Sequence, residues 1–438
     1  MNRIHQLHQL GQSLWYDNIQ RSLLENGQLA KLIEQGFIRG VTSNPTIFHN
    51  AIARSNDYDA ALKPMAWSGW NAEQIFTQLA IEDIQAAADL FLPLYETTNA
   101  ADGYVSLEVN PLLANDTDGT VAEAKRLWSL VNRPNLMIKI PATPEGIPAI
   151  RQAIAAGINV NVTLIFSLIR YAEVIDAYLS GLEERLAQGL PIDRIASVAS
   201  FFVSRVDTKV DQRLNEIIKR EESNAPLAQS LLGKAAIANA RLAYALFLEK
   251  FAEERFLTLK PKGARVQRPL WASTSTKNPA YRDVIYVEEL IGPDTVNTVP
   301  PQTLEAFLDH GEAQVKLGAY VEEEQKIIQE LAELGISMEQ VTYELEVEGV
   351  KAFADAFTAL QQAIEQRRQA ALEELGPLRD AIPAAVARQE QDQVIRRIFE
   401  VDPTLWTDDP KGQAEIRQRM GWLRSPENSR SLIEEYQQ

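Results

Sequence analysis

The chain has 438 residues, of which 45% are apolar, a proportion that is normal for a soluble globular protein. Lys and Arg number 43 against 60 Asp and Glu, and the resulting net charge of −17 disfavours nucleic acid or an anionic membrane as a partner. The absence of cysteine excludes disulfides, thiol catalysis and thiolate metal sites. Neither a signal-peptide core nor a membrane-spanning apolar run is found, so we expect a cytoplasmic protein.

Short strand-like runs alternate along the chain with longer segments that have helical periodicity. Strands are predicted over residues 13–17, 38–44, 104–109, 136–140, 158–166, 195–203, 268–274 and 294–299. Helices are predicted over 120–131, where Thr120 and Glu123 would form a capping box, and over 167–188 and 226–251. Eight strands with helical crossovers predict an α/β fold, a (β/α)₈ barrel with additional helices. The alternative is an open doubly wound sheet, although no Gly-x-Gly-x-x-Gly turn follows any strand.

The character of the sequence changes after about residue 375, where it becomes charged, helical and interrupted by prolines. We therefore predict a barrel domain over residues 1–375 and a helical extension of unknown role over 376–438. The extension contains Trp406 and Trp422, which we expect to bury apolar area.

Several predicted strands are polar on one face. In 136–140, Lys139 points away from Ile138 and Ile140, because successive side chains alternate between the two faces of a strand. The same alternation, or a position at the end of a strand, brings further polar side chains to that face: Asp17, Asn44, Glu108, Asn161 and Thr163. In a barrel this face is the interior, and the carboxyl ends of the strands form the catalytic mouth.

Each of these residues also has a purely structural interpretation. Asn44 precedes Pro45 and is typical of a helix N-cap, and Asp17 could cap a helix that starts at Asn18. Glu108 could form a structural ion pair with Lys139. Together, however, they place more polar groups on the inner face than a structural core requires.

The combination suits one kind of chemistry. Desolvation disfavours the ammonium form of a lysine among apolar neighbours, and a neutral amine can attack a ketone to form a Schiff base. The iminium then accepts electrons from an adjacent carbon–carbon bond, and the two carboxylates Asp17 and Glu108 can move the protons that this requires. Asn44, Asn161 and Ser200 could hold sugar hydroxyls. This is class I aldolase chemistry, for which we expect no metal and no other cofactor.

Five motifs resemble those of the transaldolase family, in order and within a likeness that covers about residues 1–370: GVTSNPTIF, SLEVNP, MIKIPAT, INVNVTLIFS and SVASFFVSRVD. The resemblance implies a circularly permuted class I aldolase-type barrel with the reactive lysine on the fourth strand, where Lys139 is predicted. It also implies transfer of a dihydroxyacetone unit from sedoheptulose 7-phosphate or fructose 6-phosphate to glyceraldehyde 3-phosphate or erythrose 4-phosphate, a step of the non-oxidative pentose phosphate pathway. Its partners would be sugar phosphates, and we expect a monomer or a homodimer.

The resemblance also implies a role for each motif residue. Lys139 would form the Schiff base, Asp17 would be the acid/base for carbon–carbon cleavage, and Glu108 with Thr163 would position a catalytic water. Substrate hydroxyls would be bound by Asn44, Asn161 and Ser200.

Two basic residues are candidates for the phosphate. Arg205 resembles the family's main phosphate-binding arginine, although an ion pair with Asp207 or Asp211 would also fit the spacing. The family can carry a second arginine after a serine, and this chain has Ser275 and Lys277 there. A lysine lacks the bidentate fork of arginine, and Lys277 could instead be an ordinary surface lysine.

Two alternatives to a transaldolase stay open. A fructose-6-phosphate aldolase would release free dihydroxyacetone, and a non-catalytic barrel would only bind sugar phosphates. The tail motifs PTLWTDD and MGWLRSP resemble the linker of transaldolase/glucose-6-phosphate isomerase fusions, although we predict no isomerase activity.

Overall fold

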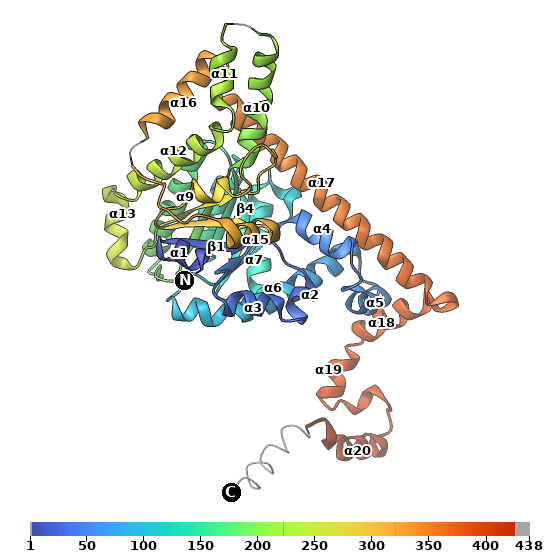
Figure 1. Cartoon of the computed structure of the whole chain (residues 1–438). Coiled ribbons are helices and arrows are strands. Elements are labelled where there is room, and N and C mark those ends of the chain that lie inside the picture. The colour runs from blue at the N-terminus through green and yellow to red at the C-terminus, as the bar shows by residue number, and fades with distance from the viewer. Residues whose placement is uncertain (1, 222, 320, 425–438) are drawn as a thin grey trace. The chain divides into compact units, whose positions relative to one another are not determined.

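The computed structural model describes residues 2–221, 223–319 and 321–424 (Figure 1). Eight parallel strands pair in chain order and close into a barrel. They are β1 (Gln12–Tyr16), β2 (Gly40–Val41), β3 (Tyr104–Glu108), β4 (Leu136–Pro141), β5 (Val160–Ile165), β6 (Ser197–Phe202), β7 (Arg268–Ala272) and β8 (Thr295–Val299). The predicted barrel and its eight strands are confirmed, Lys139 lies on the fourth strand, and the alternative of an open sheet is wrong.

Helices follow the strands and surround the barrel in the first of two compact units, which contains residues up to 58 and 76–363. Fully buried Ile138 and Ile140 lie on the face of β4 opposite Lys139. The helices up to α17 are α1 (Arg3–Gln9), α2 (Arg21–Glu25), α3 (Gln28–Glu34), α4 (Pro45–Ala53), α5 (Asp59–Trp67), α6 (Ala72–Thr97), α7 (Thr117–Val131), α8 (Gly146–Ala155), α9 (Leu168–Ala187), α10 (Ser204–Lys219), α11 (Ala225–Leu231), α12 (Ala235–Lys250), α13 (Glu254–Leu259), α14 (Ile285–Glu288), α15 (Pro301–His310), α16 (Glu322–Glu333) and α17 (Met338–Glu373).

The second compact unit joins residues 59–75 to the segment from residue 364 onward. The segment contains α18 (Ala381–Gln391), α19 (Val394–Phe399) and α20 (Pro410–Arg419). Within this unit the Trp67 indole donates to the Ala371 carbonyl at 2.8 Å. The boundary predicted at residue 375 thus lies inside the second unit. Trp406 and Trp422, which we expect to bury apolar area, are 49% and 65% exposed, so each covers only part of its side chain.

Two local predictions differ from the structure. Helix α7 begins at Thr117 with Asp116 as its N-cap, so the capping box at Thr120 is wrong; the Thr120 hydroxyl donates instead to the Leu113 carbonyl. The helix predicted over 226–251 is two helices, because the chain turns at Gly233, which has φ +71°. In the described part of the chain, no single helix is long and apolar enough to span a bilayer; α11 and α12 meet that test only as a pair bent by 58°.

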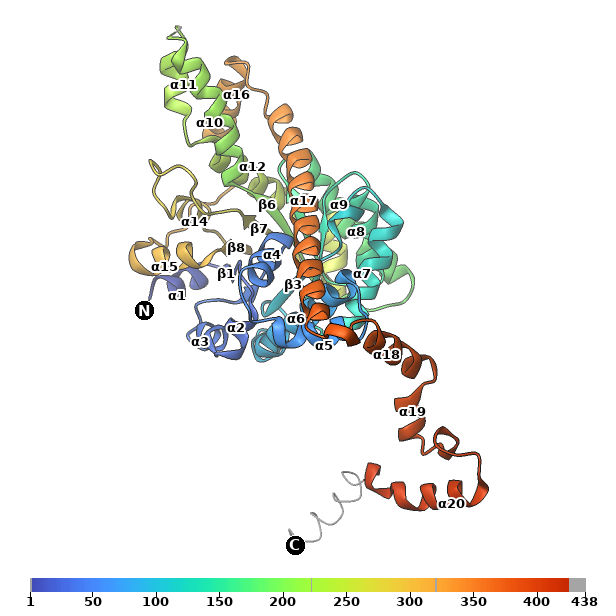
Figure 2. The same ribbon diagram turned by 90° about the vertical axis from the view of Figure 1, so that its right-hand side faces the viewer.

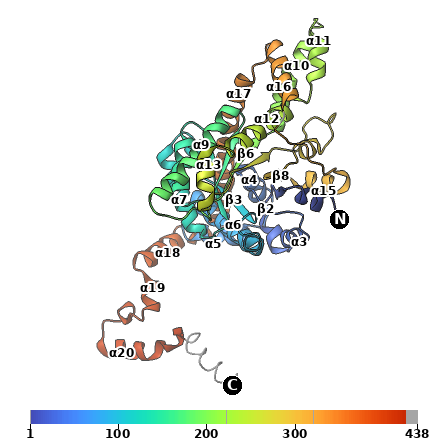
Figure 3. The ribbon, with the colours of Figure 1, turned by 90° about the vertical axis from the view of Figure 1, so that its left-hand side faces the viewer.

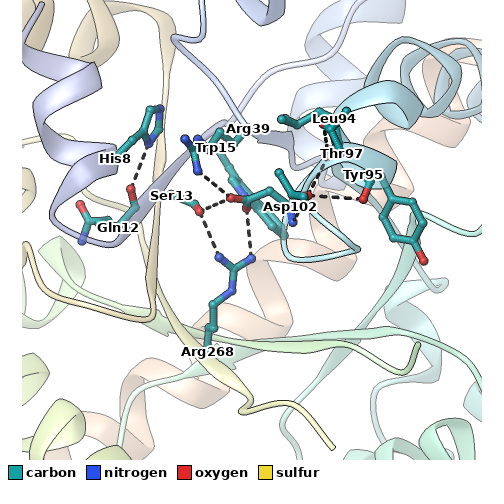
Figure 4. Close-up of polar contacts among 11 residues, drawn as sticks. His8, Gln12, Ser13, Trp15, Arg39, Leu94, Tyr95, Thr97, Asp102 and Arg268 are labelled. Atoms are coloured by element: carbon teal, nitrogen blue, oxygen red, sulfur yellow. Dashed lines mark hydrogen bonds and ion pairs between the residues drawn. The ribbon is translucent and has the colours of Figure 1, made fainter. Parts of the chain in front are cut away.

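A hydrogen-bonded polar cluster lies at the amino end of the barrel (Figure 4). The buried Asp102 carboxylate accepts hydrogen bonds from Ser13 at 2.6 Å and from the Trp15 indole at 3.3 Å. Arg268 lies 3.2 Å from one carboxylate oxygen and Arg39 lies 3.4 Å from the other. The negative charge of Asp102 is therefore compensated by two arginines and two hydrogen-bond donors.

Helix α17 lies over the opposite, carboxyl end. In Figure 2 it crosses in front of the barrel strands, and from the opposite side, in Figure 3, it lies behind them. Its N-terminal half forms ion pairs with α9 and α10, namely Glu346 with Arg170 and Glu344 with Arg213. Further along, Phe357 packs edge-on against Phe76 with ring centroids 5.7 Å apart. The helix is thus held in place on both sides of the barrel mouth.

Candidate active site

A cavity of about 440 Å³ opens at the carboxyl end of the barrel. Most of the residues predicted from the sequence line it, from the ends of different strands and the loops that follow: Asp17, Asn44, Lys139, Thr163, Ser200, Arg205, Ser275 and Lys277. Glu108 and Asn161 are not on the lining and lie directly behind it. The structure therefore brings all ten predicted site residues to one end of the barrel.

Lys139 is the central residue of the site. Parallel pairing places it beside Glu108 on β3 and beside Asn161 on β5. Its side chain is 7% exposed, and Nζ donates a hydrogen bond to the Ser43 carbonyl at 3.3 Å. Nζ lies 3.6 Å from Oε2 of Glu108, which is longer than a hydrogen bond. The amine is therefore buried at the wall of a cavity, with a carboxylate beside it.

The Glu108 side chain is only 6% exposed. Burial raises the pKa of Glu108 to about 7; the charge of Lys139 opposes this shift and the charge of Asp17 adds to it. Its Oε2 has no hydrogen-bond partner among the described protein atoms. The ion pair between Glu108 and Lys139, which the sequence offered as a structural interpretation, is present at 3.6 Å. It still leaves the Glu108 carboxyl able to gain and lose a proton near neutral pH.

Asn161 and Ser200 form part of one hydrogen-bonded chain. Asn161 is fully buried and its amide nitrogen donates to the Ser106 hydroxyl at 3.0 Å. The Ser200 hydroxyl donates to the Asn161 carbonyl oxygen at 2.7 Å. Asn161 thus orients Ser200, and of the two it is Ser200 that reaches the cavity.

Thr163 lines the cavity next to an irregularity in β5. The pairing of β5 with β6 shifts register between Val162 and Ile165, and Leu164 has φ +61°, which is strained for a residue other than glycine. The Thr163 hydroxyl is fully buried and has no partner among the described protein atoms. The bulge therefore interrupts regular pairing where an unsatisfied hydroxyl faces the site.

Asp17 and Asn44 follow the first two strands. Helix α2 begins at Arg21, so Asp17 does not cap a helix at Asn18; its Oδ1 accepts a hydrogen bond from Thr42 at 2.7 Å. Asn44 is the N-cap of α4, and its Oδ1 accepts from the Ile47 amide at 2.9 Å. The capping interpretation is confirmed for Asn44 and wrong for Asp17, yet both side chains line the cavity.

Arg205 is a half-buried cation that forms no ion pair with any carboxylate of the described residues. Neither alternative ion pair forms, because Asp207 accepts from Tyr286 and Asp211 accepts from Tyr281, both at 2.7 Å. The guanidinium lies 5.2 Å from the centre of the Phe202 ring. Burial lowers the pKa of Arg205, opposed by the more distant charge of Glu348. Over the described ranges, no carboxylate is within ion-pair distance of it, and it faces the cavity.

Lys277 and Ser275 line the same cavity as Arg205. The Lys277 amine donates to the Ser275 hydroxyl at 2.7 Å, and Lys277 is exposed. Both residues line the cavity, so Lys277 is a surface lysine that also reaches the site. Within the part of the chain that the structure describes, no group of three or more His, Asp or Glu is arranged to hold a metal ion.

The cavity also has lining residues that the sequence did not indicate, among them Thr42, Ser273 and Phe353. Thr42 could have been found from its place between Val41 and the end of the strand. Ser273 has φ +56°, and its hydroxyl lies 3.0 Å from that of Ser204. It could not have been found, because the residue type serine does not indicate a positive φ. Phe353 comes from α17, and nothing in the local sequence indicates that it approaches Lys139.

Comparison with known proteins agrees with this geometry. A sequence profile of the family described as transaldolase/fructose-6-phosphate aldolase matches residues 14–364. A protein of Trichodesmium erythraeum named transaldolase is 45% identical over 370 residues, 84% of this chain and 97% of that protein. The transaldolase of Thermobifida fusca is 49% identical over 366 residues, 83% of this chain and 98% of that protein. The chain therefore belongs to the transaldolase/fructose-6-phosphate aldolase family.

Proposed function

We propose that this chain is a transaldolase that transfers a dihydroxyacetone unit between sugar phosphates through a Schiff base on Lys139. The observation that carries the proposal is the pairing of two features in one cavity. A buried amine lies beside a carboxyl with a pKa of about 7, and an arginine that pairs with no carboxylate in the described part of the chain faces the same space. The first suits imine chemistry and the second suits a phosphate.

Binding begins with the phosphate. The donors would be sedoheptulose 7-phosphate or fructose 6-phosphate, which are dianionic near neutral pH, whereas the chain has a net charge of −17. Local cations must therefore attract the substrate, and the cavity offers Lys277 and the guanidinium of Arg205, which pairs with no carboxylate of the described residues. Asn44 and Ser200 would then hold sugar hydroxyls, with Asn161 fixing Ser200.

Imine formation joins the substrate to the enzyme. Nζ of Lys139 attacks the ketone carbon, and the carbinolamine that results must lose water to become an iminium. Glu108 is close enough to exchange protons through one water, and its pKa near 7 lets it act as both acid and base. The unpartnered oxygens of Glu108 and Thr163 supply two acceptors for that water.

Carbon–carbon cleavage follows at the neighbouring bond. Asp17 removes the proton from the hydroxyl beyond that bond, the bond electrons pass to the iminium, and an aldose phosphate leaves. An enamine of dihydroxyacetone remains on Lys139. Attack of the enamine on glyceraldehyde 3-phosphate or erythrose 4-phosphate reverses these steps and completes a reaction of the non-oxidative pentose phosphate pathway.

The alternative within the family is a fructose-6-phosphate aldolase, which would release dihydroxyacetone instead of transferring it. The relatives reported above are named transaldolases, and this favours transfer. A non-catalytic sugar-phosphate-binding barrel would have no use for a buried amine beside a carboxyl with a raised pKa.

Reduction with borohydride in the presence of fructose 6-phosphate tests the proposal. An imine on Lys139 should be reduced to a stable adduct, and mass mapping should place it on Lys139 and on no other lysine. An adduct on Lys234 or Lys277 would overturn the assignment of the nucleophile. No adduct at all would favour a binding protein over an enzyme.

A further inference from the structure

Phe353 is a residue of the cavity that the proposed mechanism does not use. It lies on α17, is 6% exposed, and lines the cavity. Nζ of Lys139 lies 5.6 Å from the centre of its ring. That nitrogen is the atom that would become part of the imine, so an apolar ring would lie beside the covalent intermediate.

The position of Phe353 is fixed by its helix. On one side, Glu344 and Glu348 of α17 form ion pairs with Lys209 of α10. On the other side, Phe357 packs on Phe76, which packs edge-on against Phe48 of α4 with centroids 5.6 Å apart. A ring held between two such attachments has little freedom to leave the cavity.

Helix α17 also approaches the strained part of β5. A Cβ atom built on Gly349 would lie 3.0 Å from the Leu164 side chain, and 3.7 Å from the guanidinium of Arg205. Gly349 is four residues before Phe353, on the same face of the helix. Because a side chain at Gly349 would push the helix outward, this glycine allows the close approach that brings Phe353 over Lys139.

The enamine on Lys139 has two fates, which differ in what bonds to the enamine carbon. In transfer, this carbon bonds to the aldehyde carbon of the acceptor, the aldehyde oxygen takes a proton, and water then hydrolyses the resulting iminium to free the new ketose. In release, the enamine carbon takes a proton instead, and water hydrolyses the resulting iminium to free dihydroxyacetone and the amine. Because water completes both fates, the choice depends on whether a proton donor, such as a water molecule, reaches the enamine carbon before the acceptor arrives.

We propose that Phe353 is a positioning residue that keeps bulk water from the carbon of the Lys139 enamine until the acceptor arrives, and so favours transfer over release of dihydroxyacetone. The ring offers no donor or acceptor to a water, and its face can stabilise the iminium cation. This inference rests on the function proposed above. The family is described by two activities, transaldolase and fructose-6-phosphate aldolase. The inference is that a residue of α17, a helix outside the strand motifs, decides between them.

The test measures partitioning on the full chain. Fructose 6-phosphate is supplied with a fixed amount of erythrose 4-phosphate, and free dihydroxyacetone and transferred product are both quantified. Phe353→Ala should raise the ratio of release to transfer on the order of tenfold, the change that follows from losing one modest transition-state preference. Phe353→Leu restores apolar bulk and should return the ratio close to that of the unsubstituted protein.

Phe357→Ala is the matched control. Phe357 is on the same helix one turn away, is also 6% exposed, and packs on Phe76. It should leave the ratio unchanged. An equal rise with Phe357→Ala, or no return with Phe353→Leu, would show that loosening of α17 is responsible and would overturn the proposal.

Borohydride trapping separates the inference from the proposed function. If Phe353→Ala traps an adduct on Lys139 normally but partitions like the unsubstituted protein, the inference is wrong and the Schiff-base function stands. If the unsubstituted protein traps nothing, the proposed function fails first. Should Phe353→Ala not fold, Phe353→Gln keeps much of the side-chain length and brings a polar group to the amine, and an unchanged ratio in that variant also overturns the inference.

Discussion

The two ends of the barrel treat buried charge in opposite ways. At the amino end, Asp102 is bonded by Ser13 and Trp15 and faces two arginines (Figure 4). At the carboxyl end, Arg205 has no counter-charge among the described residues, and Glu108 approaches Lys139 only to 3.6 Å. Since unpaired buried charge is costly, the carboxyl end retains groups that stability alone would not keep. The difference separates a structural polar cluster from a reactive one.

The largest effect should come from Lys139→Met. Turnover and borohydride trapping should be lost by at least about 10⁴-fold, because no other amine can form the covalent bond. Thermal stability should not fall, since methionine has similar length and removes a buried charge. Calorimetry alongside the trapping assay checks both. Lys277→Met, on the exposed wall, should still trap, and a destabilised Lys139→Met protein would mean that the amine is mainly structural.

Asp17→Asn and Glu108→Gln should divide the reaction into its two halves. A general acid or base contributes about 10²–10⁴-fold. Asp17→Asn should lose turnover on that order and still form a trappable Schiff base, whereas Glu108→Gln should slow trapping itself. Single-turnover trapping of both variants measures this. The reverse pattern would exchange the two roles, and full turnover in both variants would make neither residue catalytic.

These roles show which part of the site the sequence could predict. The strand alternation of 136–140 and the resemblance of the surrounding motifs predicted the fold and indicated Lys139, and register then places Glu108 and Asn161 beside it. Such information is local, because neighbouring strands of a barrel have a regular relation to one another.

Other parts of the molecule depend on tertiary contacts and could not be predicted in the same way. Phe353 approaches Lys139 because of how α17 docks, and that docking depends on ion pairs with distant helices. Asn44 shows a further limit: the structural interpretation as an N-cap was right, but it did not exclude a place on the cavity wall. The exposed Trp406 and Trp422 show that apolar residues alone do not predict burial.

Arg205→Ala should affect binding more than chemistry. Losing a hydrogen bond to a charged group should raise KM for fructose 6-phosphate roughly ten- to hundredfold. KM for unphosphorylated fructose should hardly change, because that substrate has no phosphate to lose. Steady-state kinetics with both ketoses make the comparison, and Arg205→Lys should lie between. An equal loss on both substrates would mean that Arg205 supports the fold.

The pH dependence of imine formation should report Glu108. If the carboxylate is the required base, its pKa of about 7 predicts that trapping accelerates about tenfold for each unit by which the pH rises toward 7. Glu108→Gln should be slower and lack this dependence. The stability of the fold should change in the opposite direction. The folded protein keeps the Glu108 proton up to about pH 7, whereas the unfolded chain releases it near pH 4.5. The contribution of Glu108 to the free energy of unfolding is therefore fully present below pH 4.5 and is lost as the pH rises to about 7. Rate profiles of both proteins from pH 5 to 8 provide the check.

The smallest effect on turnover should come from the amino end. Asp102→Asn keeps the volume of the side chain but removes the buried negative charge that faces Arg268. It also replaces one of the carboxylate oxygens, which accept hydrogen bonds, with an amide nitrogen, which donates them. Breaking such a pair should cost about 2–4 kcal/mol of unfolding free energy. The turnover of the protein that remains folded should stay within about twofold, because additive effects are expected for distant sites without shared partners. Denaturant unfolding and kcat on the same preparation measure the two quantities. If Asp102→Asn lowered kcat strongly at full stability, the amino end would belong to the functional machinery, and the contrast between a paired structural end and an unpaired reactive end would not hold.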